Sequence, residues 1–434
     1  MSSKEKTSNI IYYEAPEKIE NLWIDKNSLS NDFENGKGRI ILKDSVRKID
    51  GKAFAECLGL TSVVIPDSIE KIGVAAFFNC QYLTSAVIPN SVAEIGETAF
   101  CGCYSLKSLF IPESVVKIGN GAFRFCLDLT SIIVDKNNKK YNSGDNCNAI
   151  IETKTNTLLF GCLNTVIPNS VTEIAAHAFT ACSLRSIVVP DSVKKIGAMA
   201  FRFCSSLESV VIPDSVLEID GWVFEGCESL KSVKISGSVG KVGFFAFHGC
   251  KSLTSFVIPD SVEEIGDYAF RNCTALSSIV IPDSVTKIGN NAFYGCTALT
   301  EMNIPSSVTE IGEDAFCGCT DLSSVKIPNS VEKIGEGAFG RCCSLMSVMI
   351  PVLVKQLSNR TFACCSNLKS VVLPASLEVI GDSAFWGCHK LKFVMIPDSV
   401  KTIGEEAFKG CEELSEETRE RISAKIVLGS KIKN

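Results

Sequence analysis

The stretch Ile281-Pro-Asp-Ser-Val-Thr-Lys-Ile-Gly-Asn-Asn-Ala-Phe-Tyr-Gly-Cys-Thr-Ala-Leu299 recurs in altered copies through most of the chain. Its proline is followed by others at intervals of 23 residues, at Pro305, Pro328 and Pro351. Fifteen phenylalanines occupy one place in this repeat, and each has a cysteine three residues later. Self-similarity at a fixed period of about 20–50 residues indicates a solenoid, in which each unit stacks only on its neighbours. The repeat therefore predicts one elongated array.

An earlier copy shows how these residue types suit one coil. Leu60, Val63 and Ile65 fit the pattern L-x-x-L-x-L, which is typical of a short strand whose alternate side chains face a core. Pro66 ends the strand because it cannot donate a ladder hydrogen bond. The run Ala76-Phe-Phe-Asn-Cys80 is predicted to form a short helical turn that fills the third side of the coil.

The units that fit I-P-D-S-V-x-x-I-G-x-x-A-F-x-x-C-x-x-L, such as residues 281–299, resemble the leucine-rich repeats of the BspA-like type. This resemblance implies an α/β repeat fold, a right-handed solenoid of about 15–16 coils with a parallel sheet on one face. Members of this family are often microbial surface proteins that bind host or neighbouring-cell components. The insert Asp145-Asn-Cys-Asn-Ala-Ile-Ile-Glu-Thr153 is similar to one in bacterial members and favours a bacterial source.

The phase of the repeat sets the expected domain boundaries. Residues 1–39 are out of phase and are predicted to cap the first coil. Residues 40–411 are predicted to form the solenoid. Residues 412–434 are predicted to form a C-terminal capping helix, with Ser415 as its N-cap.

One unit of the array carries an insertion. Phe123 and Phe179 are 56 residues apart, so about ten extra residues enter at about 135–165. The alternating residues of this segment predict a β-hairpin with strands at 149–152 and 157–160. In a symmetric hairpin of this kind Cys147 faces Cys162. An oxidising compartment would allow a disulfide between them, and otherwise they are two neighbouring thiols.

The chain has 21 cysteines, of which fifteen belong to the repeat. Successive coils place equivalent residues about 4.8 Å apart, so these cysteines are expected to stack in a column. Cysteine behaves as a small hydrophobic residue and is often fully buried, so we favour a role in filling the core. Metal binding and disulfides along the column are the alternatives.

Chemical motifs are sparse. His177, His248 and His389 lie in different coils, and none is paired in sequence with a carboxylate at metal-ligand spacing. The run Gly335-Glu-Gly-Ala-Phe-Gly340 spells G-x-G-x-x-G, but it falls inside the repeat and precedes no long helix. We therefore predict no catalytic residues, no cofactor and no metal site, and a protein that is not an enzyme.

The net charge and the hydropathy of the sequence limit the classes of partner and the cellular locations that we predict. The net charge of −6 with no basic stripe makes nucleic acid an unfavoured partner. The sequence contains no run of about 20 apolar residues, so we predict no membrane span. The first apolar run, residues 10–13, is too short for a secretory signal, which favours the cytoplasm, whereas the family resemblance implies the cell surface. Both locations stay open.

The fifth residue of each L-x-x-L-x-L segment points away from the core, and most of these residues are apolar. The third residue is nearly always serine. A long exposed apolar stripe usually marks an interaction surface, although β-branched residues here also suit a strand. The predicted partner-binding face comprises Val64, Val87, Phe110, Ile133, Val188, Val211, Lys234, Val257, Val280, Lys326, Met349, Val372 and Met395.

These observations predict a non-enzymatic module that binds a protein or glycan partner through its Ser/Val-lined face, in adhesion. The alternative is an intracellular scaffold that self-associates through the same face.

Overall fold

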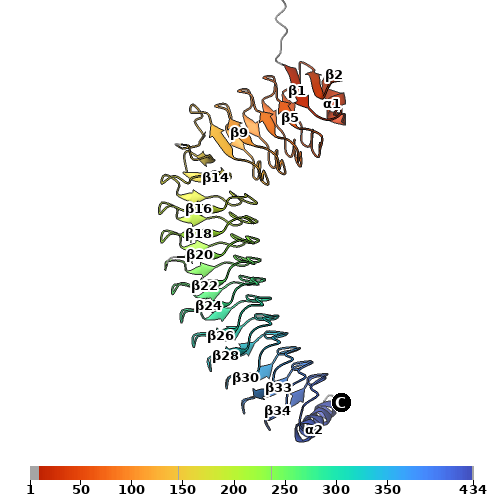
Figure 1. The fold of residues 1–434 in the computed structure, drawn as a ribbon, viewed down its shortest axis with the longest axis vertical. Helices are drawn as coiled ribbons and strands as arrows, with labels where there is room; N and C mark the ends of the chain where they lie inside the picture. Colours follow the sequence, from red (N-terminus) through yellow and green to blue (C-terminus); the bar gives the residue numbers. More distant parts are fainter. Residues whose placement is uncertain (1–8, 145, 236, 433–434) are drawn as a thin grey trace, which may run out of the picture. The chain divides into compact units, whose positions relative to one another are not determined.

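The computed structural model describes residues 9–144, 146–235 and 237–432, with side chains up to residue 425. The chain divides into two compact units, Met1–Ser205 and Ser206–Asn434, called unit 1 and unit 2 below. Within each unit the successive turns of the chain stack so that their short strands lie side by side (Figure 1). The predicted leucine-rich-repeat solenoid with parallel sheets is confirmed, with about 15 turns.

Each coil of unit 2 contributes a strand from the L-x-x-L-x-L segment. These first strands pair in parallel, so that Ser255 lies opposite Ser278 and Val257 opposite Val280. Equivalent side chains therefore form rows along the unit. The first strands of unit 2 are β18 (Ser209–Ile212), β20 (Ser232–Ile235), β22 (Ser255–Val257), β24 (Ser278–Val280), β26 (Glu301–Asn303), β28 (Ser324–Lys326), β30 (Ser347–Met349), β32 (Ser370–Val372) and β34 (Phe393–Val394).

A second, two-residue strand follows in each coil, just before the glycine of I-G, and forms its own parallel ladder. The sequence analysis does not predict these strands, because two residues are too few to show a period. In unit 2 they are β19 (Glu218–Ile219), β21 (Lys241–Val242), β23 (Glu264–Ile265), β25 (Lys287–Ile288), β27 (Glu310–Ile311), β29 (Lys333–Ile334), β31 (Gln356–Leu357), β33 (Val379–Ile380) and β35 (Thr402–Ile403).

Opposite charges alternate along this second ladder from β19 to β29. Glu310 lies in register between Lys287 and Lys333, with its carboxylate oxygens 3.8 Å and 2.7 Å from their Nζ atoms. The hydrogen bond from Lys333 lowers the pKa of Glu310 below its usual value. Exposed pairs of this kind contribute only about 0.2–1 kcal/mol each to stability. The ladder mainly keeps like charges from facing each other between coils.

Unit 1 has the same two rows of strands. Its first strands are β5 (Ser62–Val64), β7 (Ser85–Val87), β9 (Ser108–Ile111), β11 (Ser131–Val134) and β16 (Ser186–Val188). Its second strands are β4 (Lys48–Ile49), β6 (Lys71–Ile72), β8 (Glu94–Ile95), β10 (Lys117–Ile118), β15 (Glu173–Ile174) and β17 (Lys195–Ile196).

The N-terminal end of unit 1 is antiparallel. Strands β1 (Ile10–Glu14), β2 (Ser28–Glu34) and β3 (Lys37–Leu42), with helix α1 (Leu22–Asn27), form a sheet in the order β2-β3-β1-β5-β7. The strand at Ile40, expected to be the first parallel strand, instead pairs antiparallel with both β1 and β2. Because β1 comes between β3 and β5, the N-terminal segment supplies the neighbour that β5 would otherwise lack.

The predicted hairpin is present. Strands β13 (Ala149–Glu152) and β14 (Thr157–Gly161) pair antiparallel, and β12 (Tyr141–Asn142) extends the sheet beside β13. The pairing register shifts by one residue between Ile150 and Ile151. This bulge is the feature that a symmetric hairpin model lacks. Strand β14 then pairs in parallel with β15 and so joins the hairpin to the second ladder.

Stacked phenylalanines fill the core of each unit. In unit 2 the rings of Phe270, Phe293 and Phe316 are nearly parallel, with centroids 5.4 Å and 5.2 Å apart. The cysteine column of unit 2 lies beside this stack, and its thiols from Cys250 to Cys411 donate to the carbonyl of a phenylalanine one coil earlier, as Cys296 does to Phe270 at 3.1 Å. The column cysteines are buried, as the core-filling interpretation predicts, except that Cys57 and Cys126 in unit 1 are half-buried.

The A-F-x-x-C segment is a series of tight turns rather than the predicted helical turn. Tyr268 and Asn272, on either side of Phe270, have φ values of +60° and +58°. Such left-handed residues interrupt a right-handed helix. The glycine of I-G is required for a different reason, because a Cβ on Gly312 would lie 2.6 Å from the backbone of Gly289 and Asn290.

Helix α2 (Glu416–Ile432) follows the last coil of unit 2. The Ser415 hydroxyl accepts a hydrogen bond from the Thr418 amide at 3.3 Å, and Glu416 and Glu417 lie in the first turn. The side chain of Ile422 is buried. In the described part of the chain, no helix combines the length and apolar character needed to cross a membrane.

Candidate functional site

The strand face is defined here by the outward side chains of the first strands. Every predicted partner-binding residue is exposed there. Five lie in unit 1, namely Val64, Val87, Phe110, Ile133 and Val188, and eight in unit 2, namely Val211, Lys234, Val257, Val280, Lys326, Met349, Val372 and Met395. Strand register places them in rows, with Phe110 opposite Ile133 and Met349 opposite Val372. The structure thus presents the predicted residues together within each unit.

On the strand face the row of fifth residues is mostly apolar but includes two lysines, and the row of third residues beside it is mostly serine. Lys234 lies opposite Val211, and Lys326 lies opposite Asn303. Among the described residues neither lysine has an ion-pair partner. Their ammonium groups therefore remain available to a carboxylate from outside.

The apolar surface widens near the end of unit 2. Phe393 occupies the register position opposite Ser370, where most other coils have serine. Its side chain is 69% exposed, and that of Met395 is 81% exposed. Met346, Met349 and Val372 in the adjoining coils are exposed as well. This cluster adds large side chains to the row of valines.

The hairpin cysteines depart from the symmetric arrangement. The register shift at Ile150 brings Cys162 beside Asn148, whose carbonyl accepts a hydrogen bond from the Cys162 thiol at 3.2 Å. Cys147 and Cys162 are both buried free thiols. Burial raises the pKa of Cys147 to about 11, so its thiol stays protonated at neutral pH.

The repeat brings histidines close to carboxylates that sequence spacing did not suggest. His248 Nδ1 lies 3.4 Å from Glu225, and His389 Nδ1 lies 3.7 Å from Glu412. Each pair is separated by 23 residues, so the partners occupy equivalent places in successive coils. Only a search at the repeat interval would have found them. The described residues contain no group of three potential ligands that could hold a metal ion.

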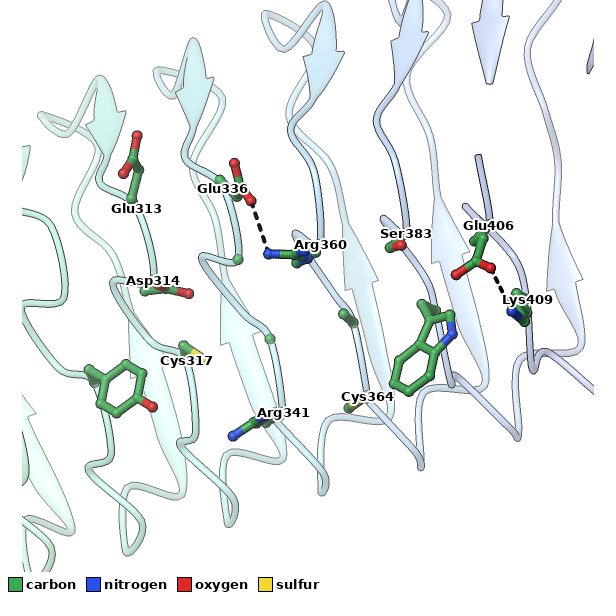
Figure 2. A pocket seen from close by; sticks show the side chains of 15 residues that line it. Glu313, Asp314, Cys317, Glu336, Arg341, Arg360, Cys364, Ser383, Glu406 and Lys409 are labelled. Atoms are coloured by element: carbon green, nitrogen blue, oxygen red, sulfur yellow. Dashed lines mark hydrogen bonds and ion pairs between the residues drawn. The ribbon is translucent and has the colours of Figure 1, made fainter. Parts of the chain in front are cut away.

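The turn face is defined here by the outward side chains of the G-x-x-A-F-x-x-C segments. In unit 2 it contains a hollow of about 810 Å³ (Figure 2). The residue after each phenylalanine forms one row, and its carbonyl accepts a hydrogen bond from the coil before, as Trp386 O does from Cys364 N. In this row Cys317, Gly340 and Ala363 are small, while Tyr294 and Trp386 on either side are large. The hollow exists because three coils lack bulk at this position.

Two glycines lie at the floor of the hollow. Gly337 has a φ of +62°, and a Cβ there would lie 2.2 Å from Asp314 Oδ1. A Cβ on Gly340 would lie 3.2 Å from the carbonyl oxygen of Gly337. A side chain at position 337 would displace the Asp314 carboxylate, one at position 340 would crowd the Gly337 carbonyl, and either would fill part of the space. Both glycines belong to the G-x-G-x-x-G run at 335–340, which the sequence analysis assigned to the repeat.

Charged side chains around the hollow are largely paired. Arg360 lies 3.6 Å from Glu336, and Lys409 lies 2.5 Å from Glu406 (Figure 2). Burial raises the pKa of Cys317 to about 12, with a further contribution from Asp314. The thiol is therefore protonated at neutral pH and provides no nucleophile. The lining residues are Tyr294, Glu313, Asp314, Cys317, Glu336, Gly337, Gly340, Arg341, Arg360, Ala363, Cys364, Ser383, Trp386, Glu406 and Lys409.

The turn face has a different character in three earlier coils of unit 2. Trp222, Phe245 and Tyr268 occupy equivalent places, and Phe245 stacks on Tyr268 with centroids 4.3 Å apart. All three have left-handed φ values, of +58°, +55° and +60°. Bulky residues rarely adopt this conformation, which elsewhere favours glycine or asparagine. The turn face therefore changes from an aromatic stack to a hollow within one unit.

The repeats match the BspA type Leucine rich repeat region, a family of which six copies are found, over residues 26–150, 172–300, 240–365 and 286–415. These matches cover most of the chain. The chain belongs to this family. BspA-type repeat proteins are interaction or surface proteins and are generally non-enzymatic.

Two solved structures illustrate what this BspA-type chain is similar to. A leucine-rich repeat protein from Bacteroides ovatus is 28% identical, with 87% of this chain and 98% of that chain covered and a TM-score of 0.55. A leucine-rich repeat protein from Eubacterium ventriosum is 24% identical, with 66% and 83% covered and a TM-score of 0.56. The second likeness concerns the fold alone. No curated protein matches the chain.

Proposed function

We propose that this BspA-type protein is a non-enzymatic binding module that docks a protein partner along its strand face, in adhesion. The observation that carries the proposal is the row of exposed apolar side chains, which strand register continues from coil to coil. Burying one Val or Met side chain contributes about 1.5–3 kcal/mol. Several aligned side chains are therefore enough for stable association after the cost of ordering both partners.

The chemistry of the strand face indicates what the partner carries. Val257 and Val280 require an apolar strip on the partner, since their side chains offer no polar group. Lys234 and Lys326 require carboxylates near that strip, because nothing in the described part of the chain neutralises them. The expected partner is thus a protein surface with an apolar strip and acidic residues beside it. Adhesion itself is supported by the family alone.

The test introduces charge into the row. Val211→Glu, Val257→Glu and Val280→Glu together should abolish partner binding without unfolding, because all three side chains are already in solvent. The matched control is Leu217→Glu, Val352→Glu and Leu353→Glu, three exposed apolar residues of unit 2 outside the strand face. Proteins captured from host-cell extract by the native chain and both variants would be compared by quantitative mass spectrometry.

A partner that is retained by the control and lost from the strand-face variant supports the proposal. Lys234→Glu with Lys326→Glu should then weaken the same interaction and reduce its dependence on salt. Partners retained by the strand-face variant while its circular dichroism is native would refute the proposal. If light scattering shows a native dimer that the variant lacks, the strand face binds a second copy and the scaffold alternative replaces adhesion.

A further inference from the structure

We propose that the hollow on the turn face of unit 2 is a binding site for a neutral oligosaccharide. It lies on a different side of the coils from the strand face and is a separate site. Its volume of about 810 Å³ falls in the range of ligand sites, about 300–1,000 Å³. The proposal rests on the shape of the hollow, its aromatic wall and the balance of its charges.

The hollow has small residues at its floor and aromatic residues at its sides. Gly337, Gly340 and Ala363 provide the floor, and the rows of the repeat place Tyr294 and Trp386 at either side. Trp386 is 41% exposed, although an indole of this size usually gains stability from being covered. The apolar C–H face of a pyranose ring packs well on such an aromatic surface. A sugar would therefore cover area that the protein itself leaves in water.

The charged groups suit a ligand with hydroxyls and no net charge. Four carboxylates and three cations line the hollow, and two ion pairs already join Arg360 to Glu336 and Lys409 to Glu406. Such pairs supply fixed donors and acceptors but little net potential. A strongly anionic or cationic ligand would meet repulsion as often as attraction. Hydroxyl groups can donate to the carboxylates and accept from the guanidinium and ammonium groups.

The backbone of the hollow argues against a peptide as the ligand. Extended peptides are usually held by main-chain hydrogen bonds to a free strand edge. Here the amides of the floor are already used, since Gly337 N donates to Asn359 O at 2.9 Å and Arg341 N to Ala363 O at 2.7 Å. Cys364 N likewise donates to Trp386 O at 2.6 Å. Recognition must therefore come from side chains.

The experiment compares variants of the full chain on an array of neutral glycans, acidic glycans and peptides. Positive glycans would then be titrated by calorimetry. Trp386→Ala removes the aromatic wall, and Ala363→Leu fills the floor from a half-exposed position. Phe244→Ala is the matched control, because Phe244 is also 41% exposed on the turn face of unit 2 but lies outside the hollow.

We expect at least one neutral glycan to bind, with affinity reduced about 10-fold or more by Trp386→Ala and by Ala363→Leu, and unchanged by Phe244→Ala. The strand-face variant should bind the same glycan normally, which separates this proposal from the proposed function. The proposal is overturned if no neutral glycan binds, or if binding is indifferent to both hollow variants. Binding of only acidic glycans or only peptides through Trp386 would overturn it equally.

Discussion

The strand face and the turn face are built by the same coils, yet their residues vary in opposite ways. Along the strand face of unit 2 the row position holds Val257 and Val280 in successive coils. Along the turn face the row position holds Tyr294, Cys317 and Gly340 in successive coils. Between these two surfaces lies one core of stacked phenylalanines and cysteines that hardly changes.

This difference indicates where an extended interface and where a local binding site can arise on a repeat protein. A row of similar side chains offers the same contact at every coil, so it suits an extended partner whose affinity grows with the number of coils covered. A row that changes at every coil can make a local site, because walls and floor require different residues. The core constrains neither row, since only the inward residues of the repeat pack in it.

The largest effect is expected when two adjacent residues are substituted in turn, one in the core and one on the turn face. Phe293→Ala should destabilise unit 2 by about 3–5 kcal/mol, because it opens a cavity in the ring stack. Tyr294→Ala, one residue later, should cost about 1 kcal/mol or less, since it loses mainly the Arg271 guanidinium 4.7 Å from its ring. Urea unfolding followed by circular dichroism measures both changes.

Each of these two variants is the control for the other, because both delete an aromatic ring from the same turn. Equal costs would show that the turn face is part of the folding core and not a free surface. A small cost at Phe293 would show that the stack relaxes around the cavity. Either result would remove the distinction between core and turn face.

An intermediate effect is expected at His177, a half-buried residue on the turn face of unit 1. Burial, with the nearby Arg124 and Arg202, lowers the pKa of His177 to about 4 from its ordinary value of 6.5. Between about pH 4 and pH 6.5, His177 is therefore protonated in the unfolded chain but neutral in the folded chain. Stability should fall as the pH drops from about 6.5 to about 4, by roughly 1–2 kcal/mol, because solvent screening at this half-buried site reduces the full value of the shift.

The variant that isolates this effect is His177→Asn. Asparagine tolerates the left-handed φ of +63° at this position and cannot titrate. Urea unfolding at pH 7, 6 and 5 should show the native chain losing stability relative to the variant at each step. Because all other groups are shared, they cancel in the difference. A difference that stays constant with pH would mean that His177 is as exposed as an ordinary surface residue.

Much of the fold could be predicted because every copy of the repeat carries the same pattern of inward-facing residues. Phe270, Phe293 and Phe316 each specify the same inward position, so errors at one coil are corrected by the others. The departures occur where the repeat is absent or too short. The antiparallel insertion of β1 and the bulge at Ile150 depend on contacts between distant segments, which no local pattern records.

The sites were predictable to different degrees for the same reason. The strand-face row follows from alternation within one strand, so Val257 and Val280 could be placed outward from sequence alone. Their role in binding stays a prediction. The hollow was missed because its walls and floor come from different coils. The residue that follows the phenylalanine changes from large to small and back to large in successive coils, from Tyr294 through Gly340 to Trp386. This change in size marks the hollow.

The smallest effect should come from the charges along the ladder of second strands. Glu310→Lys would place three lysines in register, at 287, 310 and 333, where alternation now separates them. We expect a loss of less than about 1 kcal/mol that shrinks with added salt, because these groups are solvated and screened. Glu332→Lys is the control, an exposed residue in the same unit with no ion pair among the described residues.

This comparison separates register from net charge. Both variants change the charge of the chain by the same amount, but only Glu310 lies between two lysines of neighbouring coils. If unfolding in low salt shows Glu310→Lys to be the less stable variant, the alternation stabilises the coils through direct pairing. Equal losses would mean that only the total charge matters. The second ladder would then be held by the buried isoleucines beside these charges, such as Ile311, and its surface would be as free to vary as the turn face.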